Sequence, residues 1–166
     1  MSGIAGNLES KNGIVGNPDG SYIFLGQKDS FTGAEDTHHL LSTDTRYDPL
    51  GGWDTSAHKY TVKGSGWYIF SCFWESYDSG NNTGGIMTQL KKNGSTIYEK
   101  YNYVKYSGSG WVYDSMRHFG AESSCPYNAS AGDYFQYYLW FKTGNGSDNY
   151  MSHPFITIYK ADKSGI

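Results

Sequence analysis

Several features are scarce in this chain, and their scarcity excludes whole classes of protein. Among 166 residues there are only two cysteines and four prolines, and 17% of the residues are charged. No run approaches the ~20 apolar residues of a membrane-spanning helix. Residues 1–20 also lack the apolar segment of a signal peptide. We therefore expect no membrane partner, and we expect a chain that begins at Met1 to be made and folded in a cytoplasm.

The two cysteines do not form a metal motif. Their spacing fits no zinc site, and two ligands are too few to hold zinc. Cys72 lies inside the apolar run 68–74, which predicts a buried free thiol. A reducing compartment disfavours a disulfide between Cys72 and Cys125.

The charge pattern argues against nucleic acid as a partner. The net charge is −3, and Lys91 and Lys92 are the only adjacent basic residues. A duplex-binding protein would concentrate its basic residues on one face. Aromatic residues also stack on bases, but we favour a β core and a subunit interface as their role.

The chain has no recognisable catalytic or cofactor fingerprint. It lacks a Gly-x-Ser-x-Gly elbow, a phosphate-binding loop and a dinucleotide-binding motif. The carboxylates that could serve in acid–base catalysis adjoin Thr, Pro or Gly, where Asp commonly forms Asx-turns; they are Asp44, Asp48, Asp54 and Asp133. We therefore expect neither an enzyme nor a cofactor.

We likewise expect no metal ion. His38 and His39 are adjacent, so on a strand they would point to opposite faces. The oxygen-rich segments 78–82 and 145–149 leave calcium open as an alternative. Neither has the spacing of an EF-hand, and we favour solvated turns.

The chain is rich in glycine, with 22 residues, and in aromatic residues, which make up 17% of the sequence. This composition is typical of an all-β fold with many turns. Alternation of apolar and polar residues predicts a hairpin through 59–74 around the turn 64–66. It predicts a second hairpin around the turn Asn93-Gly94. In that hairpin Leu90 should face Ile97, and Ile86 should face Tyr101. Further strands are expected at 21–25, 38–41, 111–119, 134–142 and 153–159.

Four motifs, in order along residues 40–160, carry a family resemblance. They are Tyr60-Thr61 with 66–70 (Gly-Trp-Tyr-Ile-Phe), 90–94 (Leu-Lys-Lys-Asn-Gly), Gly132-Asp133, and Phe155 in the last strand. Together they resemble the globular head of complement component one-q, which shares its jelly roll with tumour necrosis factor. The resemblance implies a homotrimeric jelly-roll β-sandwich of two antiparallel sheets with about ten strands. It places Tyr60, Gly66, Tyr68, Phe70 and Phe155 in the core.

The strand 134–141 is aromatic on both of its faces. One face would fill the core, and the other would be an exposed patch unless a partner covers it. We predict that it forms the trimer interface, with candidate residues Tyr134, Phe135, Tyr137, Tyr138, Trp140 and Phe141. A sugar-binding aromatic platform is the rival interpretation.

The chain contains neither collagen-like repeats nor heptads. It resembles the stand-alone one-q-like virion proteins of tailed bacteriophages. We divide it into a Gly-rich arm, 1–20, and a jelly-roll domain, 21–166. We expect a homotrimeric capsid decoration (cement) protein on the virion surface that binds the major capsid protein through apolar arm residues, Ile4, Leu8, Ile14 and Val15. The alternative is a receptor-binding knob of a fibre that recognises a host-surface glycan; a free lectin-like module comes third.

Overall fold

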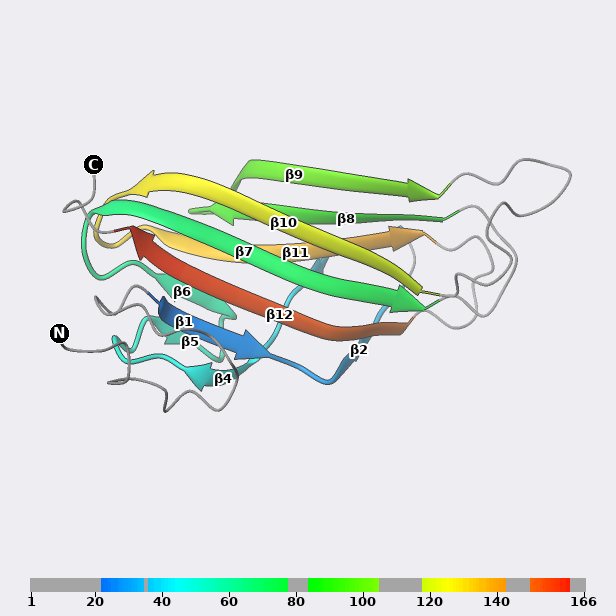
Figure 1. The fold of residues 1–166 in the computed structure, drawn as a ribbon, viewed down its shortest axis with the longest axis horizontal. Helices are drawn as coiled ribbons and strands as arrows, with labels where there is room; N and C mark the ends of the chain where they lie inside the picture. The colour runs from blue at the N-terminus through cyan, green and yellow to red at the C-terminus, as the bar shows by residue number, and fades with distance from the viewer. Residues whose placement is uncertain (1–21, 35, 78–83, 105–117, 143–149, 162–166) are drawn as a thin grey trace, which may run out of the picture.

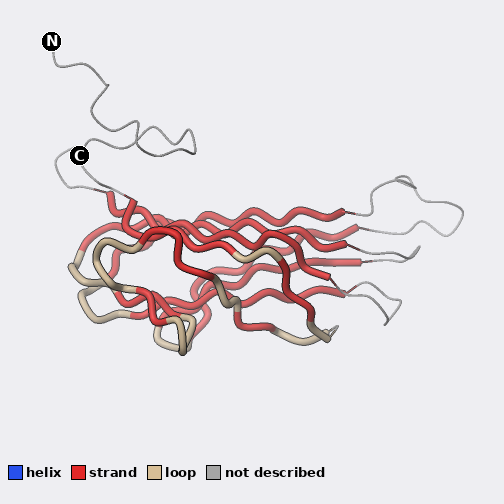
Figure 2. Tube along the Cα trace, turned by 90° about the horizontal axis from the view of Figure 1, so that it is seen from below, coloured by secondary structure: helices blue, strands red, loops and turns tan. Residues whose placement is uncertain are grey.

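The chain forms a sandwich of two antiparallel sheets (Figures 1 and 2). The computed structural model describes residues 22–34, 36–77, 84–104, 118–142 and 150–161. These residues form twelve strands and no helix. This part of the chain therefore holds no helix long and apolar enough to cross a membrane. The predicted all-β, two-sheet class is confirmed.

The first sheet has the strand order β10-β7-β12-β1-β4, with β2 beside β12. Its strands are β1 (Tyr22–Gln27), β2 (Ser30–Thr32), β4 (Asp44–Tyr47), β7 (Gly66–Tyr77), β10 (His118–Ala129) and β12 (Tyr150–Ala161).

The second sheet has the order β5-β6-β11-β8-β9, with β3 beside β11. Its strands are β3 (His39–Leu40), β5 (Trp53–Asp54), β6 (Lys59–Thr61), β8 (Gly84–Lys92), β9 (Ser95–Val104) and β11 (Tyr134–Lys142). The bounds of β11 agree with the strand expected at 134–142.

Aromatic side chains from both sheets fill the space between them. Phe70 of β7 stacks on Phe135 of β11 with ring centroids 4.0 Å apart. The buried indole N–H of Trp74 donates to the Thr88 hydroxyl at 2.8 Å, which gives this layer a polar link between the sheets. Burial of each large side chain contributes roughly 1.5–3 kcal/mol.

The glycine-containing segment 64–66 connects strands of different sheets, so the hairpin expected through 59–74 is wrong. β6 pairs with β5 and β11, whereas β7 pairs with β10 and β12. Tyr60 of β6 and Tyr68 of β7 are both almost fully buried. Each points into the core from the sheet to which its strand belongs. Gly66 has a φ of 149°, a value that residues other than glycine rarely adopt. The Tyr68 hydroxyl donates a hydrogen bond to the Gly64 carbonyl.

The turn between β8 and β9 has the expected geometry. Asn93 and Gly94 have φ values of 48° and 85°. Positive φ at both central residues is the mark of a type I′ turn, whose twist matches that of the flanking strands. This prediction is confirmed.

Beyond the turn, the register of β8 and β9 differs from the one predicted. Lys91 pairs with Thr96 as expected, but Leu90 then pairs with Tyr98 and not with Ile97. A β-bulge absorbs the extra residue. Ile97 and Tyr98 both pack against the core, which accounts for the bulge, since strict alternation would turn one of them outward.

Strand β10 is longer than the sequence pattern indicated. Residues 111–117 of the strand expected at 111–119 lie outside the described residues. From His118 the chain continues as strand to Ala129, paired with β7 throughout. Gly120 and Pro126 interrupt the pattern that marks a strand. Among the described strands β10 lies at the edge of its sheet, which is where a proline such as Pro126 is tolerated.

Candidate functional site

Strand β11 divides its aromatic residues between the core and the outer surface. Three of the six residues predicted at the trimer interface are buried between the sheets, namely Phe135, Tyr137 and Phe141. For these the prediction is wrong, because strand alternation turns them inward. The other three, Tyr134, Tyr138 and Trp140, are half-buried on the outer side.

The residues of the family motif also divide. Those predicted in the core and buried there are Tyr60, Gly66, Tyr68 and Phe70. Phe155 is only half-buried, and its neighbours Ile156 and Ile158 point inward instead. A register shift between Ser152 and Phe155 sets this phase of the strand, so the prediction for Phe155 is wrong.

The candidate carboxylates Asp48 and Asp54 serve turns, as their neighbours in the sequence predicted, whereas Asp44 lies exposed on strand β4, so the turn expected there is wrong. Asp48 accepts hydrogen bonds from the backbone N–H groups of Gly52 at 3.0 Å and Trp53 at 2.8 Å. Asp54 accepts from two backbone N–H groups at 2.9 Å. The pKa of Asp54 lies below its ordinary value, and the hydrogen bond from the Ala57 N–H is the largest cause of this shift. Both carboxylates are thereby engaged in local structure.

The histidines do not gather around a metal. In the described part of the chain no three His, Cys, Asp or Glu residues lie close enough to hold an ion. His39 stacks on Phe141 at 5.7 Å, and its Nε2 donates to the Ala34 carbonyl at 2.7 Å. His38 and Asp44 are exposed. The oxygen-rich segments 78–82 and 145–149 lie outside the described residues.

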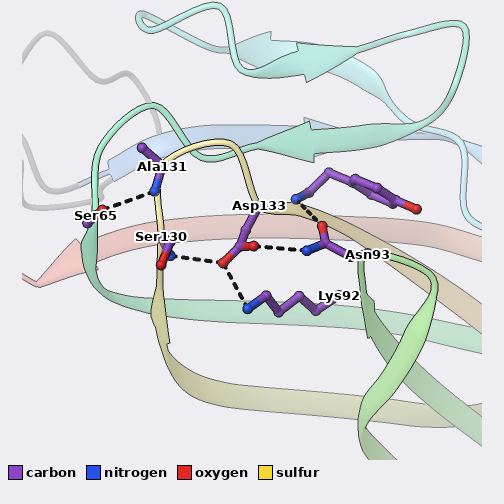
Figure 3. A network of polar contacts seen from close by, with 7 residues as sticks. Ser65, Lys92, Asn93, Ser130, Ala131 and Asp133 are labelled. Atoms are coloured by element: carbon purple, nitrogen blue, oxygen red, sulfur yellow. Dashed lines mark hydrogen bonds and ion pairs between the residues drawn. The ribbon is translucent and has the colours of Figure 1, made fainter.

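A polar network ties together turns at one end of the sandwich (Figure 3). Asp133 forms an ion pair with Lys92 at 2.9 Å and accepts hydrogen bonds from the Asn93 amide and the Ser130 N–H, both at 2.9 Å. Lys92 is the largest cause that lowers the pKa of Asp133. The β8–β9 turn is thus fixed to the turn that precedes β11.

The same network reaches the connection between the sheets. The N–H of Ala131 donates to the Ser65 hydroxyl at 3.0 Å, across 66 residues of sequence. The Val62 carbonyl accepts from the N–H of Gly132 at 2.9 Å. Three separate connections therefore form one polar end, and the role of Asp133 is structural.

The outer side of the first sheet carries an apolar surface that the sequence analysis missed. We call it the apolar face; its residues are Trp67, Ile69, Phe73, Phe155 and Tyr159. Trp67 is 45% exposed and Phe73 is 37% exposed. Phe73 lies opposite Phe155, and Ile69 lies opposite Tyr159 on the adjacent strand. The signal was present, because residues 67–74 are almost continuously apolar, as in β11.

The outer side of the second sheet carries a different surface, which we call the mixed face. Its residues lie in two cross-strand rows on β9, β8 and β11: Tyr101–Met87–Trp140 and Glu99–Gln89–Tyr138. Tyr101 pairs with Met87 and not with Ile86, because of the bulge. The prediction that this side of β8 is half-solvated is wrong, since Met87 and Gln89 are only 1% and 8% exposed.

Lysine ammonium groups lie over the tyrosines of β11. Lys91 Nζ is 4.1 Å from the ring centroid of Tyr138, and Lys59 Nζ is 5.0 Å from that of Tyr134. A cation over an aromatic face contributes roughly 0.5–1 kcal/mol at an exposed site. These pairs cover part of the aromatic surface with charge.

The two cysteines are buried free thiols, as predicted for Cys72. Burial raises the pKa of both Cys72 and Cys125 above the ordinary value of a thiol. A buried thiol with a raised pKa is a poor nucleophile, because the thiolate is the reactive form. The thiols therefore belong to the core and not to a site.

The predicted arm, 1–20, with Ile4, Leu8, Ile14 and Val15, lies outside the described residues.

The comparisons with known proteins agree with this architecture. No family model matches the chain, and no curated protein matches it. Among solved structures, it is similar to the globular domain of zebrafish complement 1qA, with a TM-score of 0.58 and 14% identity over 86% of this chain and 98% of that one. It is also similar to Eiger TNF from S. frugiperda, with a TM-score of 0.52 and 13% identity over 88% and 96% of the two chains.

The fold is a jelly roll of the one-q and tumour necrosis factor type. Since the sequence identities are only 13% and 14%, the likeness extends to the fold and no further.

Proposed function

We propose that this chain is a homotrimeric capsid decoration protein of a tailed bacteriophage. It would bind the outside of the shell and stabilise contacts between neighbouring capsid subunits. The apolar face is the single observation that carries the assembly part of this proposal. The virion part is supported by the resemblance of the sequence to stand-alone one-q-like phage proteins.

The apolar face is the subunit interface in this proposal. Two large aromatic residues, Trp67 and Phe73, are 45% and 37% exposed on one regular strand. Between them lies Ser71, a small residue that lets a neighbouring surface approach closely. Removing such side chains from water contributes about 25 cal/mol per Å² of apolar surface, and aromatic residues are enriched in the cores of interfaces. This assignment moves the interface from β11 to β7 and β12.

A trimer suits a virus shell on symmetry grounds. A closed three-fold assembly presents three equal copies of each binding surface. Placed on a local three-fold axis of a shell, it can contact three subunits at once, so each weak contact is strengthened by the other two. The function is mechanical and needs no cofactor.

Two measurements test the proposal. Light scattering of the purified full chain should give the mass of a trimer, and a monodisperse monomer at micromolar concentration would overturn the assembly. Electron cryo-microscopy of phage particles should then place the protein in many copies on the shell. Its absence from particles, or its confinement to the tail, would overturn the decoration role.

The receptor-binding alternative retains the trimer but predicts a different competition result. An isolated fibre knob should occupy host receptors and inhibit phage adsorption, whereas a decoration protein should leave adsorption unchanged. Its specific support is the mixed face, which combines exposed aromatic surface with hydrogen-bonding groups. Strong inhibition by the full chain would favour the knob over the decoration protein.

A further inference from the structure

The mixed face has the layout of a small ligand platform rather than of a subunit interface. Strands β9, β8 and β11 lie side by side in the second sheet (Figure 1). Tyr101 and Trp140 flank Met87, and their ring centroids are 6.1 Å apart with an interplanar angle of 67°. Tyr101 is 42% exposed, whereas Met87 is 1% exposed. The row thus presents aromatic surface over a filled, apolar base.

The neighbouring row supplies hydrogen-bonding groups. Gln89 lies between Glu99 and Tyr138 on the adjacent strands. The Gln89 Nε2 donates to Glu99 Oε2 at 2.8 Å, which orients the amide. An exposed carboxylate, an amide and a phenol therefore lie beside the aromatic row, within one side-chain layer of it.

One acceptor in this row is unused. The Oε1 atom of Gln89 is buried and has no hydrogen-bond partner among the described residues, and Gln89 is only 8% exposed. A buried carbonyl without a hydrogen-bond partner destabilises the fold. Because the Nε2 side of the amide is held by Glu99, the amide cannot flip without losing that bond. A hydroxyl donor that displaced a side chain covering this oxygen would satisfy it.

The charges of this face favour a neutral ligand. The Glu99 carboxylate accepts from Gln89, and Lys91 lies over the Tyr138 ring. These two opposite charges flank the same row, so among the described residues this row has no excess of one sign to attract an ion. A neutral ligand with one apolar side and several hydroxyl groups matches this arrangement.

We infer that the mixed face binds a neutral saccharide. The C–H side of a pyranose ring would lie on Tyr101 and Trp140, and its hydroxyl groups would contact Glu99 and Gln89. Ligand sites generally combine aromatic surface with a few fixed polar groups, and Tyr and Trp supply an apolar body with a polar tip. The inference concerns a surface on the opposite sheet from the apolar face, and it does not depend on the decoration role.

The test uses the full chain and a panel of neutral oligosaccharides: gluco-, manno-, galacto- and chito-oligomers. Saturation-transfer NMR with the wild type should show binding of at least one oligomer, with the strongest transfer to the ring protons of one sugar face. Tyr101→Ala should weaken that binding roughly tenfold, because a large exposed aromatic contact is lost. Tyr101 lies on an edge strand and is partly exposed, so the variant is expected to fold.

Matched variants keep the result interpretable. Tyr47→Ala removes a tyrosine of similar exposure, 48% against 42%, from the first sheet, and it should leave the saccharide affinity unchanged. Gln89→Met keeps the length of the side chain but removes the acceptor, and it should also weaken binding. Thermal melting of each variant verifies that it is folded.

Three results would overturn the inference: no member of the panel binds, Tyr101→Ala binds as well as the wild type, or Tyr47→Ala loses binding to the same extent. Failure of the decoration role would look different. A chain that binds saccharide through Tyr101 but never attaches to capsids would leave this inference intact and remove the proposed function.

Discussion

On the outer side of the first sheet, Trp67 and Phe73 are 45% and 37% exposed, and their neighbour Ser71 is small. On the outer side of the second sheet, Trp140 is half-buried against Tyr101, and a lysine lies over the next tyrosine of the same strand. Both surfaces are rich in aromatic residues. Our two proposals differ because the neighbours differ: the small Ser71 favours close approach of another protein surface, and the Lys91 ammonium over Tyr138 favours a polar ligand.

The largest expected effect is the loss of the proposed trimer when the apolar face is changed, but not when the mixed face is changed. The double variant Trp67→Glu/Phe73→Glu places charges where the proposed interface is dry, so the trimer should dissociate to monomers at micromolar concentration. Tyr101→Glu on the mixed face should remain a trimer. Analytical ultracentrifugation measures both, and a trimeric double variant would show that the apolar face is not the interface.

A medium effect is expected at the turn that sets the register of the mixed face. Gly94 has a φ of 85°, so Gly94→Ala should lower the free energy of unfolding by about 1–2 kcal/mol. Gly64→Ala is the matched control. Its added Cβ would meet only the flexible end of Lys160 at 3.3 Å, and no positive φ opposes it. Urea unfolding compares the two, and equal stabilities would contradict the role of the turn conformation.

A smaller effect is expected from the cation on the mixed face. Lys91→Met keeps most of the side-chain stem but removes the ammonium group 4.1 Å from the Tyr138 ring. The loss should be about 0.5–1 kcal/mol in unfolding free energy. Lys63→Met, at an exposed lysine outside this face, serves as the control. A variant at Lys91 as stable as the control would mean that the contact contributes nothing.

The smallest effect is a dependence on pH at the polar end of the sandwich. Lys92 and the N–H of Ser130 lower the pKa of Asp133 in the folded chain from the ordinary 3.8. The stability this carboxylate contributes is therefore complete above 3.8 and is lost as the pH falls through its lower folded pKa. Asp133→Asn should make the acid side of the thermal stability profile slightly shallower. Superimposable profiles would remove Asp133 from the acid response.

Local rules explain what could be predicted from the sequence. The Asn93-Gly94 turn follows from backbone geometry, and β11 follows from its long apolar run and the Gly132-Asp133 turn before it. The Asx-turns at Asp48 and Asp54 have the same local origin. In each case the determining contacts lie within a few residues.

The predictions failed where packing between the two sheets determines the path of the chain or the direction of its side chains. Whether 64–66 closes a hairpin or crosses between layers depends on which strands lie beside β6 and β7, and alternation is the same in both cases. The bulge at Ile97 and the outward position of Phe155 shift the phase of alternation by one residue. The apolar face could have been predicted from β7, whose residues 67–74 are almost continuously apolar, as are those of β11.

The bulged strand β9 has one more consequence, which concerns the addition of strands from other chains. Among the described residues it is the last strand of its sheet, and no described strand pairs with its outer edge. An unprotected edge of this kind invites another chain to add a strand, and repeated addition gives fibrils. The bulge disturbs the spacing of that edge, and Glu99 and Lys100 stand exposed along it. Growth by strand addition is thereby discouraged at this edge.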